Sequence, residues 1–380
     1  MALQFVLLPL LAQTFSLSYA QVGMLRAVSH SAMSLLELPA GLFAERVGER
    51  RLLVIGLLGA GLGYLCVAFA SSFNLIAVGF FIAGAGAALQ HSLASSVLVK
   101  RFDAGARRRA LGTYNSAGDA GKLSFTAAFS ALVGAGLSWN WVITGLACVT
   151  LGFAVALSWL LRPSGAARAP DTPAGTSPSV QPKGWGITNV NRFSALALMV
   201  FLDSVVQAVF LTFIAFIMQA KGASQGTAGA AVVLALAGGM VGKFACGFLA
   251  AHLGDRATFI VVQLLTVVGL GLLTMLSAED SLVFLPLLGL VVQGSTTVSY
   301  GAVAEFVAPG YQARGYALIY STSSVSSVVG PFLLGWVADV SSLDTVLWIL
   351  AALSAATVSF SAVLPGRAAA KPQSSQSKEA

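Results

Sequence analysis

The chain contains little charge for its length. Asp, Glu, Lys and Arg together make up 9% of its 380 residues, whereas a soluble domain carries roughly 25%. Hydrophobic residues make up 57%. A chain of this composition lacks the polar side chains needed to cover its own surface in water. The composition therefore argues against a soluble globular domain and predicts a protein that is solvated by lipid.

Cysteine and nucleotide-binding motifs are also scarce. The three cysteines, Cys66, Cys148 and Cys246, lie singly inside apolar runs, so we expect buried packing residues, no metal site and no cofactor. No glycine-rich stretch precedes a Lys-Ser or Lys-Thr pair, which excludes the common phosphate-binding loop. Since no nucleophile–base set and no soluble domain are evident either, we do not expect an enzyme.

The basic residues that are present lie in short stretches that alternate with long apolar runs, always on the same side. Of 21 Lys and Arg, 17 follow this pattern, whereas the loops between hold almost none; Lys221, and Arg26 near the outer end of its span, are the exceptions. The 17 are Arg46, Arg50, Arg51, Lys100, Arg101, Arg107, Arg108, Arg109, Arg162, Arg168, Lys183, Arg192, Arg256, Arg314, Arg367, Lys371 and Lys378. This positive-inside pattern predicts that these stretches face the cytoplasm.

The charge pattern also bears on location and partners. It predicts a multi-pass protein of the plasma membrane, the inner membrane in a bacterium, with the linker and C-terminus in the cytoplasm. A net charge of +7 would suggest nucleic acid in a soluble protein, but here topology explains the basic residues. We therefore expect the lipid bilayer as a partner and no nucleic acid.

Eleven segments are long and apolar enough to be transmembrane helices, since a span needs about 20 mostly apolar residues. The predicted spans are 22–43, 52–71, 75–99, 110–136, 140–161, 193–219, 225–251, 258–277, 282–305, 313–337 and 343–364. The sequence thus predicts an all-α polytopic membrane protein.

The beginning of the sequence does not fit this pattern. Residues 1–11 are too short to cross, yet the charge rule places residues 12–21 outside. Residues 1–20 could be a signal peptide that is cleaved after Ala20. The alternative is that the first helix is truncated because the given start is internal. We prefer the second explanation, because a signal peptide would begin with basic residues.

The chain divides into two similar halves. Residues 163–192 are rich in Pro, Ser and Gly and predict a cytoplasmic linker between an N-terminal half (1–162) and a C-terminal half (193–364), followed by a disordered tail (365–380). The positions of Glu37, Gly41, Arg46 and Gly48 recur 206 residues later as Lys243, Gly247, His252 and Gly254. Two like halves joined by an inside loop are the parallel-repeat plan of a transporter.

One loop carries a recognisable motif in both halves. In the first half the pattern is Gly41, three residues, the acid Glu45, the base Arg46, one residue, Gly48 and then bases that include Arg50. The second copy keeps Gly247, Gly254 and Arg256 but has Ala251 in place of the acid. These residues resemble the signature between the second and third helices of the major facilitator superfamily.

The resemblance covers essentially the whole chain. It implies a fold of two six-helix halves, here about eleven full spans, and a monomer. It implies that the Gly41–Arg51 loop locks the inside face when the protein opens outward. Residues 9–23 and 84–91 also resemble the branch that includes fosmidomycin-resistance exporters. Ser92 and Leu93 stand where relatives of that branch carry an acid, so this likeness does not extend to the substrate.

Ionisable residues in mid-span are costly, about 2.5–3.5 kcal/mol each on insertion scales, and tend to face a cavity or a partner. The resemblance places Asp119 and Lys243 on the two helices that meet between the halves, which makes an inter-half ion pair feasible. Such a pair would have to break or rearrange when the halves move. The alternative is a local pair of Asp119 with Lys122, three residues away on the same helix.

Two further acids are candidates for proton coupling. Glu37 is expected to face the hydroxyl-rich stretch 321–327, either as a proton carrier or as a structural acid held by hydroxyls. Asp203, with Gln207 one turn on, lies near the middle of a helix that in the resembled family lines the central cavity. It could carry a proton or bind a cationic group of the substrate, or it could be an acid neutralised by a neighbour.

The remaining candidates are the neutral polar residues Gln90 and Asn115 and one histidine, His91. Gln90 and His91 are adjacent, so at most one faces the cavity squarely. His91 could help proton transfer or could be a hydrogen-bonded packing residue. Asn115 could line the cavity or join helices.

These features predict a secondary transporter that moves a small solute by alternating access, with proton-coupled efflux of a drug-like compound or metabolite as the first expectation. The fifth helix lacks the Gly-Pro motif that the resemblance associates with many antiporters, so uptake of a small anionic or neutral solute is an alternative. A non-transporting membrane sensor or assembly factor on the same scaffold is another.

Overall fold

The computed structural model describes residues 2–101, 104–160, 185–308 and 312–364, and these are almost entirely helical. The predicted linker falls mostly in 161–184 and the predicted tail is 365–380, so both lie outside the described residues. The α-helices are α1 (Gln4–Phe15), α2 (Tyr19–Val47), α3 (Glu49–Ala68), α4 (Phe73–Arg101), α5 (Ala104–Gly134), α6 (Trp139–Leu160), α7 (Val190–Ala220), α8 (Gln225–Leu253), α9 (Asp255–Met275), α10 (Ala278–Gly301), α11 (Gln312–Val340) and α12 (Leu343–Phe360). Short 3₁₀ helices follow α10 and α12 at Ala302–Phe306 and Ser361–Val363.

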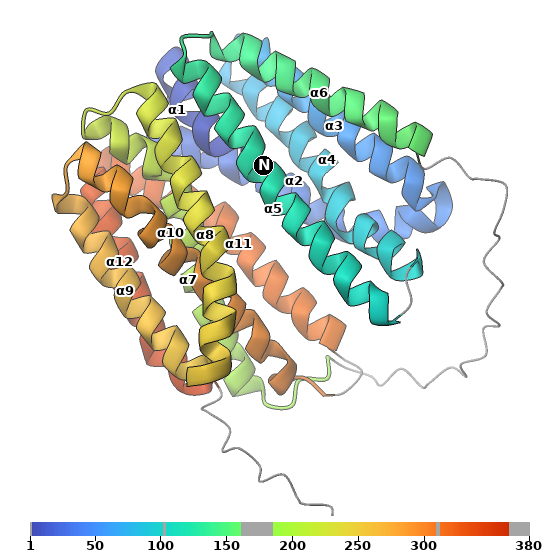
Figure 1. Cartoon of the computed structure of the whole chain (residues 1–380), viewed down its shortest axis with the longest axis vertical. Coiled ribbons are helices and arrows are strands. Elements are labelled where there is room, and N and C mark those ends of the chain that lie inside the picture. The colour runs from blue at the N-terminus through green and yellow to red at the C-terminus, as the bar shows by residue number, and fades with distance from the viewer. Residues whose placement is uncertain (1, 102–103, 161–184, 309–311, 365–380) are drawn as a thin grey trace, which may run out of the picture.

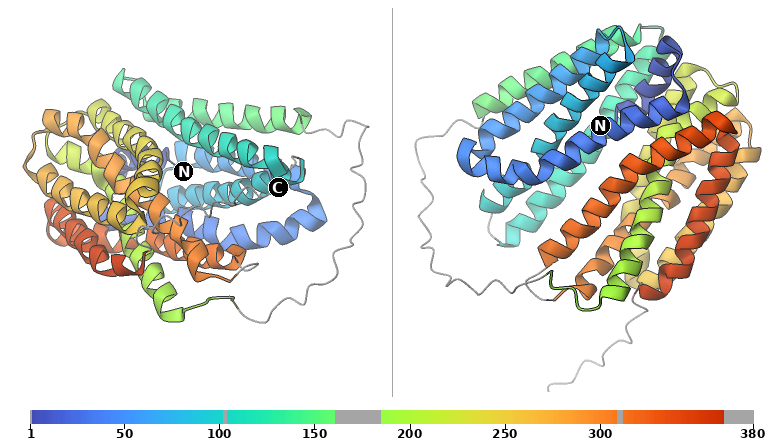
Figure 2. Two further views of the ribbon diagram at one scale, coloured as in Figure 1. Left: turned by 60° about the horizontal axis from the view of Figure 1, so that its bottom comes forward. Right: turned by 180° about the vertical axis from the view of Figure 1, so that it is seen from behind.

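The helices form two bundles, α1 to α6 and α7 to α12, which lie side by side (Figures 1 and 2). The same turns recur in both bundles. Gly48 ends α2 and begins α3 with φ of 90°, and Gly254 ends α8 and begins α9 with φ of 85°. Glycine suits both turns, because other residues rarely adopt a positive φ. This recurrence agrees with the predicted repeat of 206 residues.

Helix packing repeats as well. A Cβ atom at Gly84 of α4 would lie 2.1 Å from the Ser29 carbonyl oxygen of α2, and one at Gly289 of α10 would lie 2.2 Å from the Ala235 carbonyl oxygen of α8. Glycine is needed at both places because the backbones of the two helices approach so closely, as is common where membrane helices associate. The α2–α4 and α8–α10 pairs are therefore equivalent contacts in two equivalent halves.

Nine helices among the described residues are long and apolar enough to cross a membrane, namely α3, α4 and α6 to α12. The eleven predicted spans fall on α2 to α12, but α2 and α5 do not reach this apolarity. They carry the ionisable side chains of Arg26 and Glu37, and of Asp119 and Lys122. Helix α1 has 12 residues and rises about 18 Å, less than the roughly 30 Å of the hydrocarbon core.

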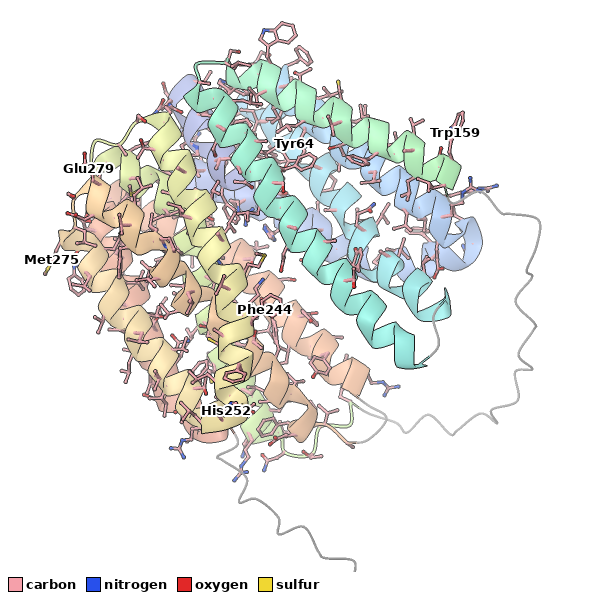
Figure 3. All side chains as sticks on the ribbon, viewed as in Figure 1. Tyr64, Trp159, Phe244, His252, Met275 and Glu279 are labelled. Atoms are coloured by element: carbon pink, nitrogen blue, oxygen red, sulfur yellow. The ribbon has the colours of Figure 1, made fainter. Side chains whose placement is uncertain are left out.

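The outer surface of the bundles is apolar. Trp159, Phe244 and Met275 project outward from α6, α8 and α9 with 64%, 69% and 78% of their surface exposed (Figure 3). Large apolar side chains that are exposed on many helices would make a water-soluble protein aggregate. In a bilayer they face lipid, in agreement with the multi-pass architecture.

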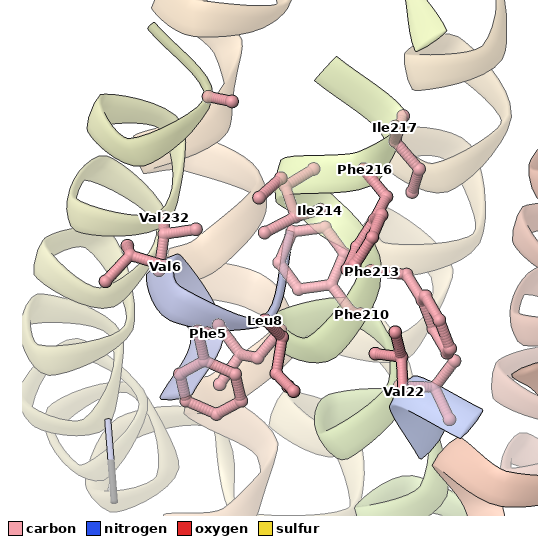
Figure 4. Close-up of a cluster of buried hydrophobic side chains, with 14 of the residues drawn as sticks. Phe5, Val6, Leu8, Val22, Phe210, Phe213, Ile214, Phe216, Ile217 and Val232 are labelled. Carbon is pink, nitrogen blue, oxygen red and sulfur yellow. The ribbon is translucent and has the colours of Figure 1, made fainter. Parts of the chain in front are cut away.

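A shared apolar core joins the two bundles. Phe5 and Leu8 of α1 pack among Phe210 and Phe213 of α7, with Val22 of α2 beside them (Figure 4). These residues are nearly or fully inaccessible. Helix α1 is thus held between the halves by side chains from both, although it is too short to span the bilayer.

We predict that Gly289→Ala destabilises the protein by about 1–3 kcal/mol, because the added methyl group forces α8 and α10 apart. The matched control is Gly145→Ala on α6, where a Cβ atom meets nothing within 4 Å. The control is expected to be neutral or slightly stabilising, since Ala favours a helix more than Gly does. The thermal unfolding midpoint of the purified protein in detergent measures both effects. Equal midpoints for the two variants would contradict the close packing.

Candidate functional site

The two halves are in firm contact at one end of the bundle, the short-loop end, which carries the turns at 16–18, 69–72, 135–138, 221–224, 276–277 and 341–342. Both carboxylate oxygens of Asp339 on α11 accept hydrogen bonds from the first backbone N–H groups of α2, from Tyr19 at 2.7 Å and from Ala20 at 2.8 Å. The Tyr19 ring meets Phe213 and Phe216 of α7 edge-on. A carboxylate at a helix N-terminus is favoured by the exposed N–H groups and the helix dipole.

Helices α5 and α8 also meet at this end and draw apart toward the other end, the basic end, which carries Arg46, Arg50 and Arg256 (Figure 1). Near the short-loop end Gly134 and Gly226 bring the two backbones close together. Further along, Asp119 of α5 lies 3.7 Å from the Nζ of Lys243 on α8. Asp119 is also 2.8 Å from Lys122 on its own helix. Both pairings considered from the sequence are therefore present, with the local one shorter.

A cavity of about 200 Å³ lies beside this ion pair, between the halves. Helices α1, α2, α5, α7, α8 and α10 all contribute to its wall. Its polar side chains are those of Arg26, His30, Asp119, Lys122, Lys243 and Gln293, and its apolar ones those of Ala2, Phe5, Leu123, Leu211, Leu236 and Met240. The cavity is therefore formed by both halves, and any movement of one half against the other changes its shape.

Arg26 of α2 is the most deeply buried cation of this cavity, with 3% of its surface exposed. Its Nη1 donates to Gln4 Oε1 at 2.7 Å, and Gln4 in turn donates to Ser29 Oγ at 2.8 Å. The guanidinium also lies over the Phe5 ring, 4.3 Å from the centroid. No carboxylate among the described residues pairs with it, and its Nε has no hydrogen-bond partner there. A buried arginine without a counterion is unusual, because a buried charge is costly unless it is paired.

Two more buried polar atoms close to Arg26 lack partners within the described part of the chain. They are His30 Nε2, one helical turn on from Arg26, and the hydroxyl of Tyr64 on α3, which lies inside the N-terminal half (Figure 3). Buried polar groups are usually hydrogen-bonded, so these atoms can each take a further hydrogen bond from a polar group that enters the site.

Asp203 lies in a different setting, inside the C-terminal half. Its carboxylate accepts hydrogen bonds from Gln263 of α9 at 2.6 Å, from Ser295 of α10 at 2.9 Å and from Gln207 at 2.8 Å. Gln207 accepts in turn from Thr296 at 2.9 Å. Asp203 is 4% exposed and is not part of the wall of the central cavity. The network joins α7, α9 and α10 and leaves the carboxylate well supplied with donors.

Glu37 faces α11, as expected from the sequence. It is half-buried and lines a cavity of about 540 Å³ between α2 and α11, together with Tyr320, Ser321 and Ser324. No hydrogen bond or ion pair joins Glu37 to another described residue, so the hydroxyl groups of α11 line the same cavity without holding its carboxylate.

The other candidates are dispersed. Gln90 donates to the Leu53 carbonyl of α3 at 2.9 Å, and Arg50 donates to the Ser158 carbonyl at the end of α6 at 2.5 Å. Arg46 and Arg256 are exposed. The side chains of Glu45, His91 and Asn115 lie outside the described part of the structure, and Gly41 and Gly247 lie within α2 and α8.

Sequence reasoning assigned no role to Arg26, His30 and Gln4. Arg26 was noted as an exception near the outer end of its span. The structure begins α2 at Tyr19, so Arg26 is seven residues, or about 10 Å, inside the helix. The signal that could have identified it is a lone arginine within an apolar run, since such residues mark functional sites by default.

Two equivalent helical halves, an apolar exterior and a polar cavity between the halves define a membrane transporter of the two-bundle kind. The family model of the Major Facilitator Superfamily matches residues 1–196 and again residues 196–380. The chain belongs to the major facilitator superfamily. A search of curated proteins found no match.

Solved transporter structures share this fold at low sequence identity. A bacterial homologue of the human lysosomal transporter Spinster, in an inward-facing and occupied conformation, is 16% identical with a TM-score of 0.73, over 97% of this chain and 95% of that one. The nucleoside transporter NupG is 13% identical with a TM-score of 0.74, over 95% of this chain and 96% of that one. These likenesses are evidence of a shared fold, not of a shared substrate.

We predict that Asp203→Leu lowers the stability of the protein by about 1–3 kcal/mol, because the buried amide of Gln263 and the partly buried amide of Gln207 lose their acceptor. The control is Asp344→Asn, in the first turn of α12 at the short-loop end. The thermal unfolding midpoint of each purified variant measures the effect. If Asp203→Leu melts with the wild type, the network does not hold α7, α9 and α10 together.

Proposed function

We propose that this protein carries a small solute across the membrane by alternating access, with the cavity between the halves as the solute site. The observation that carries the proposal is the asymmetry of the inter-half contacts. At the short-loop end the halves are joined by close backbone packing and by the hydrogen bonds of Asp339. Further toward the basic end, the salt bridge between the halves within the described residues is the Asp119–Lys243 pair at 3.7 Å. A rocking motion that opens the first end and closes the basic end would expose the cavity to the other side.

Direction and coupling belong to the same proposal. Export of a metabolite or drug-like compound is supported by the likeness of residues 9–23 and 84–91 to fosmidomycin-resistance exporters. The cavity of about 200 Å³ favours a small metabolite over a larger drug-like compound, since sites for drug-sized ligands run from about 300 Å³ upward. On the charge pattern, the protein would lie in the inner membrane of a bacterium with its basic end facing the cytoplasm. It would act as a monomer.

Protons are the coupling ion that we propose. Of the two acids considered for proton coupling, the half-buried Glu37 faces a cavity and has no hydrogen-bond partner among the described residues, so it can gain and lose a proton without breaking a network. Asp203 is the second candidate, and its use would require the bonds from Gln263 and Ser295 to open. His91, for which the described part gives no side chain, stays a third candidate.

The direct test compares the solutes inside cells and in the medium, with and without this gene. We expect at least one small compound to accumulate inside cells that lack the gene and to fall again when the gene is restored. A compound that is depleted inside and left in the medium would reverse the direction to uptake. If no solute changes in either compartment, the protein is not a transporter, and the sensor alternative takes its place.

The Asp119–Lys243 pair is the inter-half latch in this proposal. Asp119 and Lys243 are 27% and 41% exposed, so the pair is worth about 0.2–1 kcal/mol, as is typical of solvent-accessible pairs. We predict that Lys243→Gln raises the population of the more widely open conformation by about 1.4- to 5-fold. Spin labels at Val47 and Leu253, exposed at the basic ends of α2 and α8, measure that population after the three cysteines are replaced by alanine.

The control separates the latch from the local pair. In a Lys122→Gln background the single exchanges Asp119→Lys and Lys243→Asp each place like charges together, and the double exchange restores an opposite pair. We expect the double variant to return to the distance distribution of its Lys122→Gln parent. A double variant that resembles the single exchanges would mean that Asp119 acts only within α5.

A further inference from the structure

The charges that line the central cavity do not balance. The wall of the cavity holds one carboxylate, that of Asp119, and three cationic side chains, those of Arg26, Lys122 and Lys243. Both lysines share that carboxylate, at 2.8 and 3.7 Å. Arg26 is left without an anionic partner among the described residues. The wall of the cavity therefore carries an excess of positive charge, and the excess is deepest at Arg26.

Arg26 cannot relieve this imbalance by losing its proton, because a guanidinium stays charged in proteins. It is 97% buried, its contacts are a neutral amide oxygen and an aromatic ring, and its Nε has no partner within the described chain. A guanidinium offers donors in a planar fork that matches the two oxygens of a carboxylate. The geometry of the site is thus suited to binding an anion at Arg26.

The rest of the wall limits what the anion can be. Phe5, Leu211, Leu236 and Met240 make most of the remaining surface apolar, which suits a compact apolar body and disfavours a sugar. A cavity of about 150 Å³ holds a benzene molecule, so about 200 Å³ accommodates a ring of that size with one small head group.

We propose that the solute is a small organic monocarboxylate, with its carboxylate bound by Arg26 and its apolar part against Phe5, Leu211 and Met240. The assignment rests on the proposed function, since it names the class of solute that the same cavity carries. Lys243 adds long-range attraction and is half-exposed, whereas Arg26 makes the direct, desolvated contact. Binding therefore depends on charge first and on shape second.

The test uses three probes of nearly equal shape and different charge: benzoate, benzamide and benzylammonium. Each is added to the purified full chain in detergent, and its dissociation constant is obtained from the rise in unfolding midpoint with ligand concentration. We expect benzoate to bind at least tenfold more tightly than benzamide, since a charge-assisted contact is lost with the amide. Benzylammonium is expected not to bind. Equal binding of benzoate and benzamide would overturn the proposal.

Two variants locate the binding group. Arg26→Gln is expected to weaken benzoate binding at least tenfold and to abolish the preference over benzamide. The matched control is Lys221→Gln, which removes one cation at the short-loop end, where Lys221 donates to the Leu276 carbonyl. The control should bind benzoate as the wild type does. Unchanged binding by Arg26→Gln overturns the assignment of the carboxylate to Arg26.

Further outcomes keep the test decisive. If Arg26→Gln does not fold, the charge series on the wild type still decides, and Lys243→Gln should weaken benzoate binding by a smaller factor. Tighter binding of phenyl phosphate than of benzoate would overturn the carboxylate in favour of a phosphate. Benzoate binding without any gene-dependent change of solutes in cells would support the anion site and contradict the proposed transport. A gene-dependent change of solutes without benzoate binding would support transport and contradict the proposed anion site.

Discussion

Every backbone polar group of this protein that lies in the bilayer must be bonded within the protein, and the other features of the structure depend on that constraint. It restricts the spanning segments to helices and leaves association to close packing, because lipid is as apolar as leucine. The contacts of Gly84 with Ser29, and of Gly289 with Ala235, follow from it. The same constraint limits where polar side chains can be placed, since each one within the bilayer must find a partner or face a cavity.

The polar side chains accordingly fall into two groups. Around Asp203 the donors and acceptors match, and the network lies within one half, so it can hold α7, α9 and α10 together whichever way that half moves. Around Arg26 they do not match. Arg26 and His30 lie on the wall of the cavity between the halves, and each has a buried nitrogen without a partner among the described residues. A transporter needs both kinds of site: a rigid interior that moves as one body, and an incomplete interface that a solute can complete.

Much of this architecture could be predicted from the sequence. The periodic alternation of basic stretches and apolar runs located α2 to α12, and the motif repeated 206 residues apart identified two equivalent halves. The spacing of three residues suggested Lys122 as a partner of Asp119, and the family resemblance suggested Lys243. The direction in which a side chain points could not be predicted, because apolar residues surround these helices on all sides. For that reason Asp203 was expected near the central cavity but lies against α9 and α10, and Arg26 was set aside although it lies on the cavity wall.

The first turn of α2 has two caps, and they differ in what they depend on. Ser18 and Gln21 form a reciprocal pair within the turn, while Asp339 reaches the same turn from the other half. In the proposed rocking motion α11 would move away while the local pair stayed, so the helix end would not unravel. Separating the halves in that motion would require breaking the two Asp339 hydrogen bonds but not refolding a helix. A contact of this kind between the halves suits rapid and reversible opening and closing, because little structure would have to be rebuilt in each transport cycle.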